Sequence, residues 1–280
     1  MSSIVYQSLK PQFFRLQWLA DHVLGVSFNR PPVNAFHTAM WTEMHRIFSH
    51  IRGDGDVRAV VLYGEGKCFT GGLDLRDTVL MEANEKGTDV ARRAFLFRDL
   101  IDRFQAAITS VEKCERPVIA VTHSHCIGLA IDITSAADIR YTAQDARFSI
   151  REAAIGLAAD IGTLQRFPKV VGNDSLAREL ALTARDFSAD EARELGFVSR
   201  VFPTRDAALD GAVATAKRIA SLSPVAVVGT KMALVHGRDH SVEEGLRFMQ
   251  YLNAALLQSD DLPESVSAAM SKSTPSFAKL

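Results

Sequence analysis

Two short apolar runs constrain this chain more than any other feature of its sequence. Residues 57–63 read VRAVVLY and residues 117–121 read PVIAV, and a loop follows each run. Short runs without polar–apolar alternation are typical of strands that are covered on both faces, as in a parallel sheet. Helical patterns separate and follow the two runs, so the sequence predicts an α/β fold.

Periodicity and turn residues predict the remaining elements. Alternation over residues 14–18 and 22–28 predicts a hairpin, and Thr38 is the expected N-cap of a helix that closes at residues 53–55. The polar segment that ends at Thr88 is expected to be mobile. Further helices are predicted over residues 90–114 and 127–136, and strands over residues 138–141 and 147–150. From Gly162 onward the pattern is mainly helical, interrupted by a strand over residues 198–202, with candidate helices over residues 206–221, 224–236 and 241–259.

Composition excludes several classes of function. The 280 residues carry a net charge of −1, so no global field favours nucleic acid or an anionic membrane. No apolar run approaches the roughly 18 residues of a membrane span, and the first ten residues lack the apolar region of a secretory signal. Three cysteines without a CxxC pair disfavour a disulfide framework and a structural zinc site. We therefore expect a globular protein without a membrane span or a nucleic-acid partner.

The C-terminal tripeptide indicates an address. Ala278-Lys279-Leu280 is a conservative variant of the Ser-Lys-Leu peroxisomal signal. Residues 270–277 before it carry three serines, a threonine and a proline, a composition that favours an exposed, flexible end. We expect localisation in the peroxisome, with an import receptor as the partner that reads these three residues.

Two glycine-bearing loops follow the buried strands. In the first, Gly71 and Gly72 let the backbone turn tightly and approach a ligand, although an ordinary strand-to-helix turn has the same composition. The second contains Gly128 and opens an apolar helix, whose N-terminus offers unpaired N–H groups and a partial positive charge. If the loops face each other, two N–H donors meet at one oxygen, which is what stabilisation of a thioester enolate requires.

Three carboxylic acids stand out by their surroundings. Asp132 lies one turn into the apolar helix, where carboxylates are uncommon unless they are paired or functional. Glu152 and Asp160 are the only acids in a run of small and apolar residues, and such surroundings raise a carboxyl pKa toward neutrality, which suits general acid–base work. An ion-pair role for Asp132 and solvated loop positions for the other two acids remain alternatives.

A pair of histidines invites a metal-binding interpretation. His123 and His125 lie two residues apart, a spacing that places side chains on one face of a strand, so two imidazoles could bind one ion. No third ligand stands at a recognisable spacing, and nothing in the sequence specifies a base for a nucleophilic Cys126. We expect neither a metal site nor a thiol nucleophile.

Taken together, the motifs resemble those of the crotonase (enoyl-CoA hydratase/isomerase) superfamily over most of the chain. Residues 69–74 (FTGGLD) resemble its first oxyanion loop, and residues 126–132 (CIGLAID) with 137–141 (ADIRY) resemble its second. The resemblance continues through residues 156–166 (GLAADIGTLQR), 168–173 (PKVVGN), 197–203 (FVSRVFP) and 223–227 (SPVAV).

The resemblance implies a fold and an assembly. The fold would be crotonase-like (the ClpP/crotonase fold), an α/β spiral of ββα units over residues 1–203 that carries the active site. Residues 204–280 would form a C-terminal helical region and tail that mediate oligomerisation into a trimer or a hexamer.

The three acids imply a branch of the superfamily. Asp132, Glu152 and Asp160 fall where dienoyl-CoA isomerases carry their catalytic carboxylates, whereas enoyl-CoA hydratases typically present two glutamates and lack the third acid. The implied reaction converts a 3,5-dienoyl-CoA to the 2,4-dienoyl-CoA in fatty-acid β-oxidation, with no cofactor beyond the coenzyme A of the substrate. The implied rivals are an enoyl-CoA hydratase, a Δ3,Δ2-enoyl-CoA isomerase and a non-catalytic acyl-CoA-binding homologue.

The resemblance also implies which residues hold the acyl-CoA thioester. The backbone N–H groups of Leu73 and Leu129 would form the oxyanion hole. Further substrate-binding positions would be Gly71, Gly72, Asp74 and Gly128. The chain departs from the family pattern at Leu129-Ala130, where relatives usually have consecutive glycines, and at Ser124-His125, where they usually have small residues. A leucine Cβ could crowd the thioester, while any L-residue still supplies the N–H group.

Overall fold

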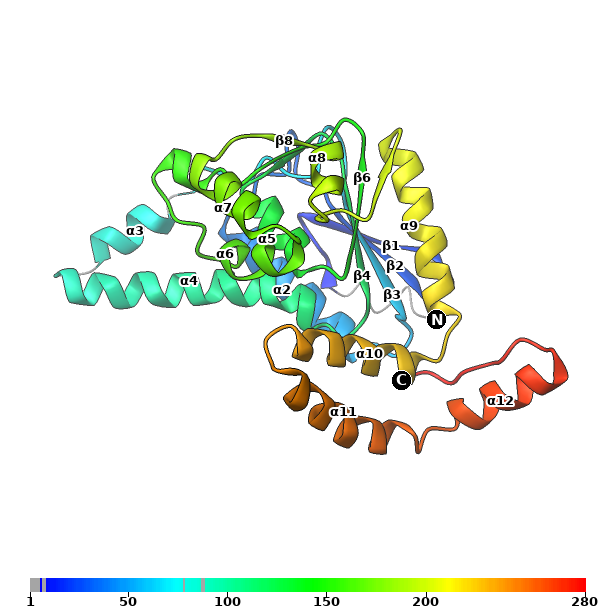
Figure 1. Cartoon of the computed structure of the whole chain (residues 1–280). Helices are drawn as coiled ribbons and strands as arrows, with labels where there is room; N and C mark the ends of the chain where they lie inside the picture. Colours follow the sequence, from blue (N-terminus) through cyan, green and yellow to red (C-terminus); the bar gives the residue numbers. More distant parts are fainter. Residues whose placement is uncertain (1–5, 7–8, 78, 87–88) are drawn as a thin grey trace.

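A six-stranded sheet, parallel from its second strand onward, forms the centre of the structure (Figure 1). The computed structural model describes residues 6, 9–77, 79–86 and 89–280. The order is β1-β2-β3-β4-β6-β9, in which β1 and β2 form the predicted antiparallel hairpin. The strands are β1 (Phe14–Ala20), β2 (Val23–Phe28), β3 (Ala59–Gly64), β4 (Val118–Thr122), β6 (Ile139–Ala143) and β9 (Arg200–Phe202).

A second sheet, of order β5-β7-β8, interleaves with the first along the chain. Strand β5 follows β4 and leads into α5, and β7 follows β6 and leads into the 3-10 helix η1, so strand–strand–helix units repeat as predicted. Because β5 and β7 pair in parallel, the helices that follow them start side by side. These elements are β5 (His125–Ile127), α5 (Leu129–Ala136), β7 (Arg147–Ser149), η1 (Glu152–Ile155) and β8 (Phe187–Ser188).

Helices cover both faces of the six-stranded sheet, which explains the uninterrupted apolar runs of β3 and β4. On one face, α2 (Thr38–Gly53) and α4 (Val90–Lys113) pack with α5 around the main core. On the other face, α9 (Arg205–Ala220) presents a stripe of buried alanines to β3 and β4. The stripe consists of Ala208, Ala212, Ala216 and Ala220.

Helix α2 begins one residue earlier than the sequence predicted. Its N-cap is His37, and Thr38 is its first residue, so the prediction of Thr38 as the cap is wrong. The Thr38 N–H and hydroxyl both donate to Asp77 Oδ2, at 2.6 and 2.8 Å. A tertiary acceptor therefore takes the role that a local capping side chain would have.

Two helices form where none was predicted. Helix α3 (Val79–Lys86) occupies the segment that was expected to be mobile. Helix α12 (Asp261–Ser271) extends the C-terminal region beyond the three predicted helices, and Pro263 is tolerated because it lies in the first turn, where an N–H has no intrahelical acceptor. The remaining helices are α6 (Thr163–Val170), α7 (Asp174–Thr183), α8 (Ala189–Glu194), α10 (Pro224–Gly237) and α11 (Val242–Leu256).

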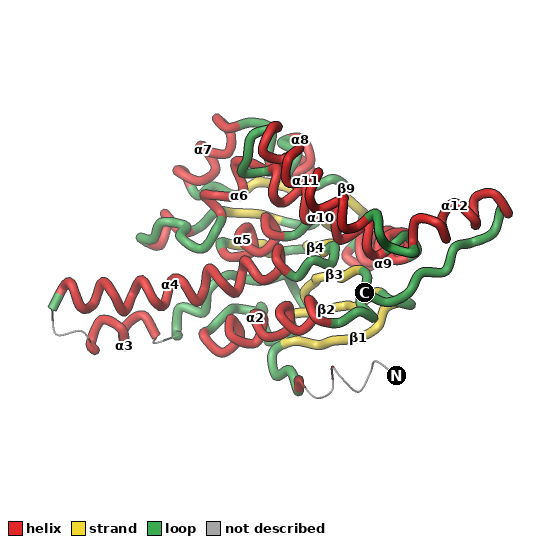
Figure 2. Tube along the Cα trace, turned by 90° about the horizontal axis from the view of Figure 1, so that it is seen from below, coloured by secondary structure: helices red, strands yellow, loops and turns green. Residues whose placement is uncertain are grey.

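Helices α10, α11 and α12 lie beside the sheet-based core rather than on the sheet (Figures 1 and 2). A buried lysine of α10 holds them to it: Lys231 donates to the Arg116 carbonyl and pairs with Asp138, both at 2.8 Å. Helix α11 has no buried residue, and Leu246 and Tyr251 on it are 67% and 73% exposed. The division of the chain after residue 203 stays a prediction. Helix α9 follows that boundary in the sequence and covers one face of the sheet.

The C-terminal tail returns from α12 toward the sheet (Figure 2). Arg58 donates to the carbonyls of Phe277 and Ala278, at 2.7 and 3.3 Å, and Lys279 Nζ lies 2.5 Å from Asp56 Oδ1. The last three residues are exposed, as expected, and charged side chains before β3 contact this end of the chain, whose flexibility stays a prediction.

Length and composition give little support to a membrane span. Among the helices described, none is by itself both long and apolar enough to cross a bilayer. Helices α9 and α10 together have the length and apolar character of a span, but the chain bends by 112° between them.

Candidate active site

The two glycine-bearing loops lie next to each other. Thr70 and Cys126 form a parallel bridge, in which the Thr70 N–H donates to the His125 carbonyl at 3.2 Å and the Thr70 carbonyl accepts from Ile127 at 3.3 Å. A Cβ atom added to Gly72 would lie 3.1 Å from the Ile127 carbonyl oxygen. The fold thus brings together two segments that are more than fifty positions apart in the sequence.

Each loop offers one backbone amide to this junction. Leu73 is bridged to Phe36 through bonds made by its neighbours Gly72 and Asp74, so its own N–H is directed away from Phe36. Leu129 is the first residue of α5, where N–H groups have no intrahelical acceptor. Within the described part of the chain, neither the Leu73 nor the Leu129 amide donates a hydrogen bond.

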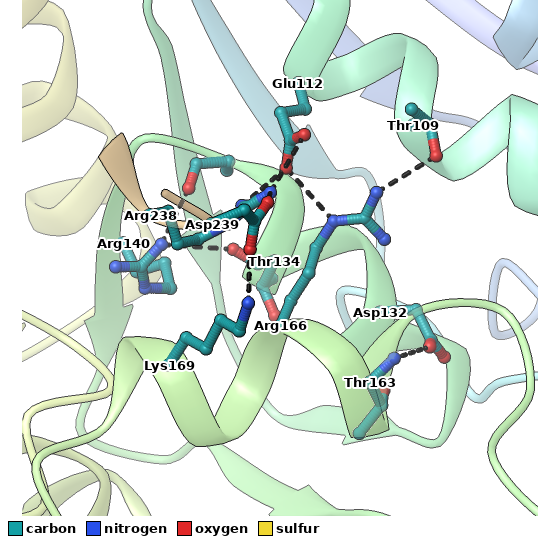
Figure 3. A network of polar contacts seen from close by, with 11 residues as sticks. Thr109, Glu112, Asp132, Thr134, Arg140, Thr163, Arg166, Lys169, Arg238 and Asp239 are labelled. Atoms are coloured by element: carbon teal, nitrogen blue, oxygen red, sulfur yellow. Dashed lines mark hydrogen bonds and ion pairs between the residues drawn. The ribbon is translucent and has the colours of Figure 1, made fainter. Parts of the chain in front are cut away.

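Asp132 is fully buried in the first turn of α5. Its Oδ1 accepts a 2.6 Å hydrogen bond from the Thr163 N–H at the start of α6 (Figure 3). Burial, followed by the negative charge of Glu152, raises the pKa of Asp132 to about 8, although Thr163 and the Arg166 charge act in the opposite direction. The raised pKa favours the protonated form of Asp132.

Glu152 opens η1 and turns inward. Its side chain lies against the N-cap of α5, because a Cβ atom added to Gly128 would be 3.0 Å from Glu152 Oε1. Burial raises the pKa of Glu152, and the charge of Asp160 raises it further. Asp160 lies on the exposed side of the site, between η1 and α6, and partial burial raises its pKa as well.

The reason for these shifts differs in part from the sequence-based expectation. The apolar residues that follow Glu152 in the chain, residues 153–158, are exposed and do not bury its carboxyl group. Glu152 is buried because its side chain packs over Gly128, on a different strand–helix unit.

Unpaired polar atoms gather around the acids. Asp132 Oδ2, Glu152 Oε2 and Thr163 Oγ1 are buried without a hydrogen-bond partner among the described residues. Because more than nine in ten buried polar groups are normally paired, such a cluster indicates a place that receives a ligand or water. Three carboxyl groups with raised pKa values beside two free amides can move protons next to a carbonyl oxygen.

Asp74 is held by its neighbours. Its carboxylate accepts from Arg30 at 2.6 Å and from Arg76 at 3.2 Å, and these bonds hold the pKa of Asp74 well below its usual range. The Gly71 N–H donates to the Val33 carbonyl at 2.8 Å. Both residues therefore fix the shape of the first loop, and direct substrate contacts by them stay a prediction.

Sequence reasoning missed three residues that support the site. Thr163 binds Asp132, and its place directly after Gly162 in the GLAADIGTLQR motif is a signal that could have found it. Gln105 on α4 donates to the Asp160 carbonyl at 2.6 Å, and Arg30 anchors Asp74. Only the fold brings these last two residues near the loops.

The Leu129 side chain packs into the main core and is 1% exposed. The leucine that departs from the family pattern is therefore part of the core cluster, and we expect it to lie outside the substrate's path. Its backbone N–H remains available at the junction of the two loops.

The histidine pair of the sequence does not build a metal site. His123 Nε2 lies 3.2 Å from the Gly66 carbonyl. Over the described ranges, no three His, Cys, Asp or Glu side chains are placed to hold a metal ion.

Comparisons with known proteins agree with this fold and these motifs. The family model for enoyl-CoA hydratase/isomerase matches residues 20–279. The rat (Rattus norvegicus) protein named mitochondrial Delta(3,5)-Delta(2,4)-dienoyl-CoA isomerase is 52% identical over 252 residues, 90% of this chain and 77% of the rat chain. The Arabidopsis thaliana protein named peroxisomal Delta(3,5)-Delta(2,4)-dienoyl-CoA isomerase is 44% identical over 260 residues, 92% of this chain and 93% of the plant chain.

Solved structures give the same result. The crystal structure of an enoyl-CoA hydratase from Bacillus anthracis has a TM-score of 0.84 and 28% sequence identity, and the match covers 95% of this chain and 99% of that one. The chain therefore belongs to the enoyl-CoA hydratase/isomerase family and has the crotonase fold that its sequence predicted.

Proposed function

We propose that the chain is an isomerase of fatty-acid β-oxidation that converts 3,5-dienoyl-CoA to 2,4-dienoyl-CoA. The observation that carries the proposal is a third carboxyl group: Asp160 lies within electrostatic reach of Glu152, which in turn acts on Asp132. Relatives about half identical over most of the chain bear the name of this isomerase, which supports the same activity here.

In the proposed reaction, the two free amides hold the thioester oxygen. Loss of a proton from C2 of the substrate makes an enolate, and its negative charge develops on that oxygen. The N–H groups of Leu73 and Leu129 would donate to it, and the N-terminus of α5 adds a partial positive charge. Preorganised donors of this kind stabilise the transition state more than the ground state.

Glu152 and Asp160 would move the two protons. One carboxylate takes the proton from C2, the double bonds shift from C3 and C5 to C2 and C4, and the other carboxyl group gives a proton to C6. One acid must therefore be ionised and the other protonated when substrate binds. Asp132, whose raised pKa favours the neutral form, would lie near the conjugated chain, where a neutral carboxyl group adds no negative charge beside the dienolate. No metal or redox cofactor is required, because charge moves through the substrate's own double bonds.

A side-by-side assay tests the proposal against its rivals. We expect the purified protein to isomerise a 3,5-dienoyl-CoA much faster than it adds water to a 2-enoyl-CoA of equal length. Faster hydration would identify a hydratase, in which Asp132 and Glu152 hold a water molecule. Faster double-bond shift in a 3-enoyl-CoA would identify a Δ3,Δ2-enoyl-CoA isomerase, and binding without turnover a non-catalytic homologue.

Replacing Leu129 by alanine should destabilise the protein without changing its acyl-chain preference. The side chain is buried in the main core, where Leu→Ala substitutions cost about 2–5 kcal/mol. Denaturant unfolding and relative rates on short and long substrates measure the two effects. Leu182→Ala, at a position that is 80% exposed, serves as the control. A stable Leu129→Ala protein with a broader chain-length profile would mean that the side chain faces the substrate.

The exposed apolar residues of the C-terminal helices support assembly with further copies of the chain. Large side chains that are more than half exposed include Leu234, Leu246, Tyr251, Leu257, Val266 and Met270. Large apolar patches of this kind on a monomer usually mark an interface. We expect a trimer or a hexamer by light scattering at micromolar concentration, and a monomer there would contradict this part of the proposal.

The C-terminal tripeptide supports localisation in the peroxisome, read by an import receptor. Relatives bear both mitochondrial and peroxisomal names, so the proposal of the peroxisome rests on the C-terminal tripeptide of this chain. Deleting Leu280 should leave catalysis intact and the protein in the cytosol, as followed by fluorescence microscopy of tagged chains. Unchanged peroxisomal import of the truncated chain would rule out the address.

A further inference from the structure

A partly buried ion network lies between Asp132 and the C-terminal helices (Figure 3). Its first member is Arg166 on α6, whose side chain is 11% exposed. Arg166 Nε donates to Glu112 Oε2 at 3.1 Å, and its Nη2 donates to Thr109 Oγ1 at 3.0 Å. Both acceptors belong to α4, so the guanidinium is fixed in one orientation.

The third nitrogen of this guanidinium lies beside the turn that binds Asp132. A Cβ atom added to Gly162 would be 2.1 Å from Arg166 Nη1 and 3.9 Å from Asp132 Oδ1. Gly162 has a φ of 140°, and only a residue without a side chain lets the guanidinium and the carboxyl group approach the same point from two sides. The next residue, Thr163, supplies the N–H that binds Asp132.

The network continues to the end of α10. Glu112 also accepts from Arg238 Nη1 at 2.7 Å and from Arg238 Nη2 at 3.2 Å. Burial would raise the pKa of Glu112, but its bonds to the two arginines lower it, so one carboxylate is shared by two guanidinium groups. Asp239 pairs with Lys169 beyond them. The cluster therefore keeps an excess of positive charge on the side that faces Asp132.

We propose that Arg166 is a positioning residue that supplies the counter-charge of the acid centre. It holds the turn at Gly162 and Thr163 against Asp132, and its charge favours any negative charge that forms there, on Asp132 or on a dienolate. Glu112 holds the Arg166 guanidinium in position. Arg238 shares the Glu112 carboxylate, so Glu112 cancels less of the positive charge of Arg166. The C-terminal helices thereby act on the site through one shared carboxylate. The effect on rate rests on the proposed function, whereas the effect on Asp132 does not.

The charged groups around this pair determine the direction of the effect. Glu152 of η1 acts on Asp132, and Glu112 of α4 pairs with Arg166. One contact further out are Asp160, which acts on Glu152, and Arg238, which bonds to Glu112. Lys169 and Asp239 pair with each other, and Arg140 donates to the Thr134 carbonyl of α5. Removing the Arg166 charge leaves less positive charge near the acids, so ionisation of Asp132 becomes less favourable and its pKa rises.

The test is a titration of Asp132 by ¹³C NMR of carboxyl-labelled aspartate, with Asp132→Asn identifying the resonance. We expect Arg166→Gln to raise the midpoint of Asp132 by at least about one pH unit, since an opposite charge within about 4–6 Å shifts a carboxyl pKa by roughly 1–3 units. Arg166→Lys, which keeps the charge, should restore most of the difference. Arg178→Gln, an exposed arginine of α7 paired only with Asp174 in the described chain, is the control and should leave the midpoint unchanged.

Kinetics on the 3,5-dienoyl-CoA provide the second measurement. Arg166→Gln should lower kcat about tenfold or more with KM nearly unchanged, because the thioester is neutral before the reaction. The alkaline limb of the pH–rate profile of this variant should move to higher pH, together with the titration midpoint of Asp132. A purely structural role would lower kcat equally at every pH and leave the midpoint in place.

Arg238→Gln keeps the inference testable if Arg166→Gln fails to fold, because Arg238 is partly exposed. This variant should also raise the titration midpoint of Asp132, by less than Arg166→Gln does. A midpoint that stays within a few tenths of a pH unit in every folded variant overturns the inference. A wild-type protein that does not isomerise overturns the proposed function alone, since the titration needs no substrate.

Discussion

Replacing Asp160 by asparagine should lower the rate of 3,5-dienoyl-CoA isomerisation by roughly 10²–10⁴-fold, the usual contribution of a positioned acid or base. Asparagine keeps the size and hydrogen bonding of the side chain but cannot transfer a proton. Glu152→Gln should have an effect of the same size. Burial raises the pKa of both carboxyl groups, which favours a proton-carrying role for each.

The double variant separates two cooperating acids from two independent ones. Because each proton transfer is useless without the other, the double variant should lose much less than the product of the two single losses. Asp210→Asn, an exposed acid of α9, controls for the loss of one negative charge and should be silent. In a hydratase, Asp160→Asn would leave water addition nearly intact while Glu152→Gln would be severe. Near-normal isomerisation by Asp160→Asn would contradict the proposed branch.

The second large effect is expected at Gly128, the N-cap of α5. Its φ is 55°, which disfavours an L side chain, and a Cβ atom there would lie 3.0 Å from Glu152 Oε1. Gly128→Ala should therefore displace the carboxyl group and turn the neighbouring Leu129 amide. Loss of one oxyanion donor costs about 10²–10³ in kcat, so we expect a fall of at least this size with the fold retained.

A second glycine with positive φ controls for backbone strain. Gly196 has a φ of 83°, and an added Cβ would meet nothing closer than 4.0 Å. Gly196→Ala should cost about 1–2 kcal/mol of stability, from the left-handed backbone alone, and should not change kcat. Equal loss of activity in both variants would show that strain, rather than contact with Glu152, explains the effect at Gly128.

The parts of the fold that could be predicted are those determined by local pattern. The apolar runs of β3 and β4 predicted buried parallel strands, because a strand covered on both faces carries few polar residues. Helix α4 followed from its amphipathic spacing, and the β1–β2 hairpin from alternation. Helix α3 was missed because it is only eight residues long and gives too short a window for a helical period. The N-cap of α2 was displaced because Thr38 binds the distant Asp77.

The residues of the site likewise fall into those that could be predicted from sequence and those that could not. Motif resemblance named the three acids and both loops, all of which the fold brings together. Two residues that hold them, Gln105 and Arg30, could not be predicted, because each comes from a distant segment and carries no local signal. The direction of Leu129 also depended on the fold, since only packing of α5 decides which side chain enters the core.

Isomerisation in D₂O, with the position of deuterium in the product found by NMR, tests the two-acid mechanism most directly. If one carboxylate removes the C2 proton and a different carboxyl group supplies C6, the proton delivered comes from an acid that has exchanged with solvent. Asp160 lies on the exposed side of the site, which allows this exchange between turnovers. We predict 2,4-dienoyl-CoA with one deuterium at C6. A C6 methylene without deuterium would show that a single group carries the C2 proton to C6, and a 3-hydroxyacyl-CoA product would show that the enzyme adds water instead.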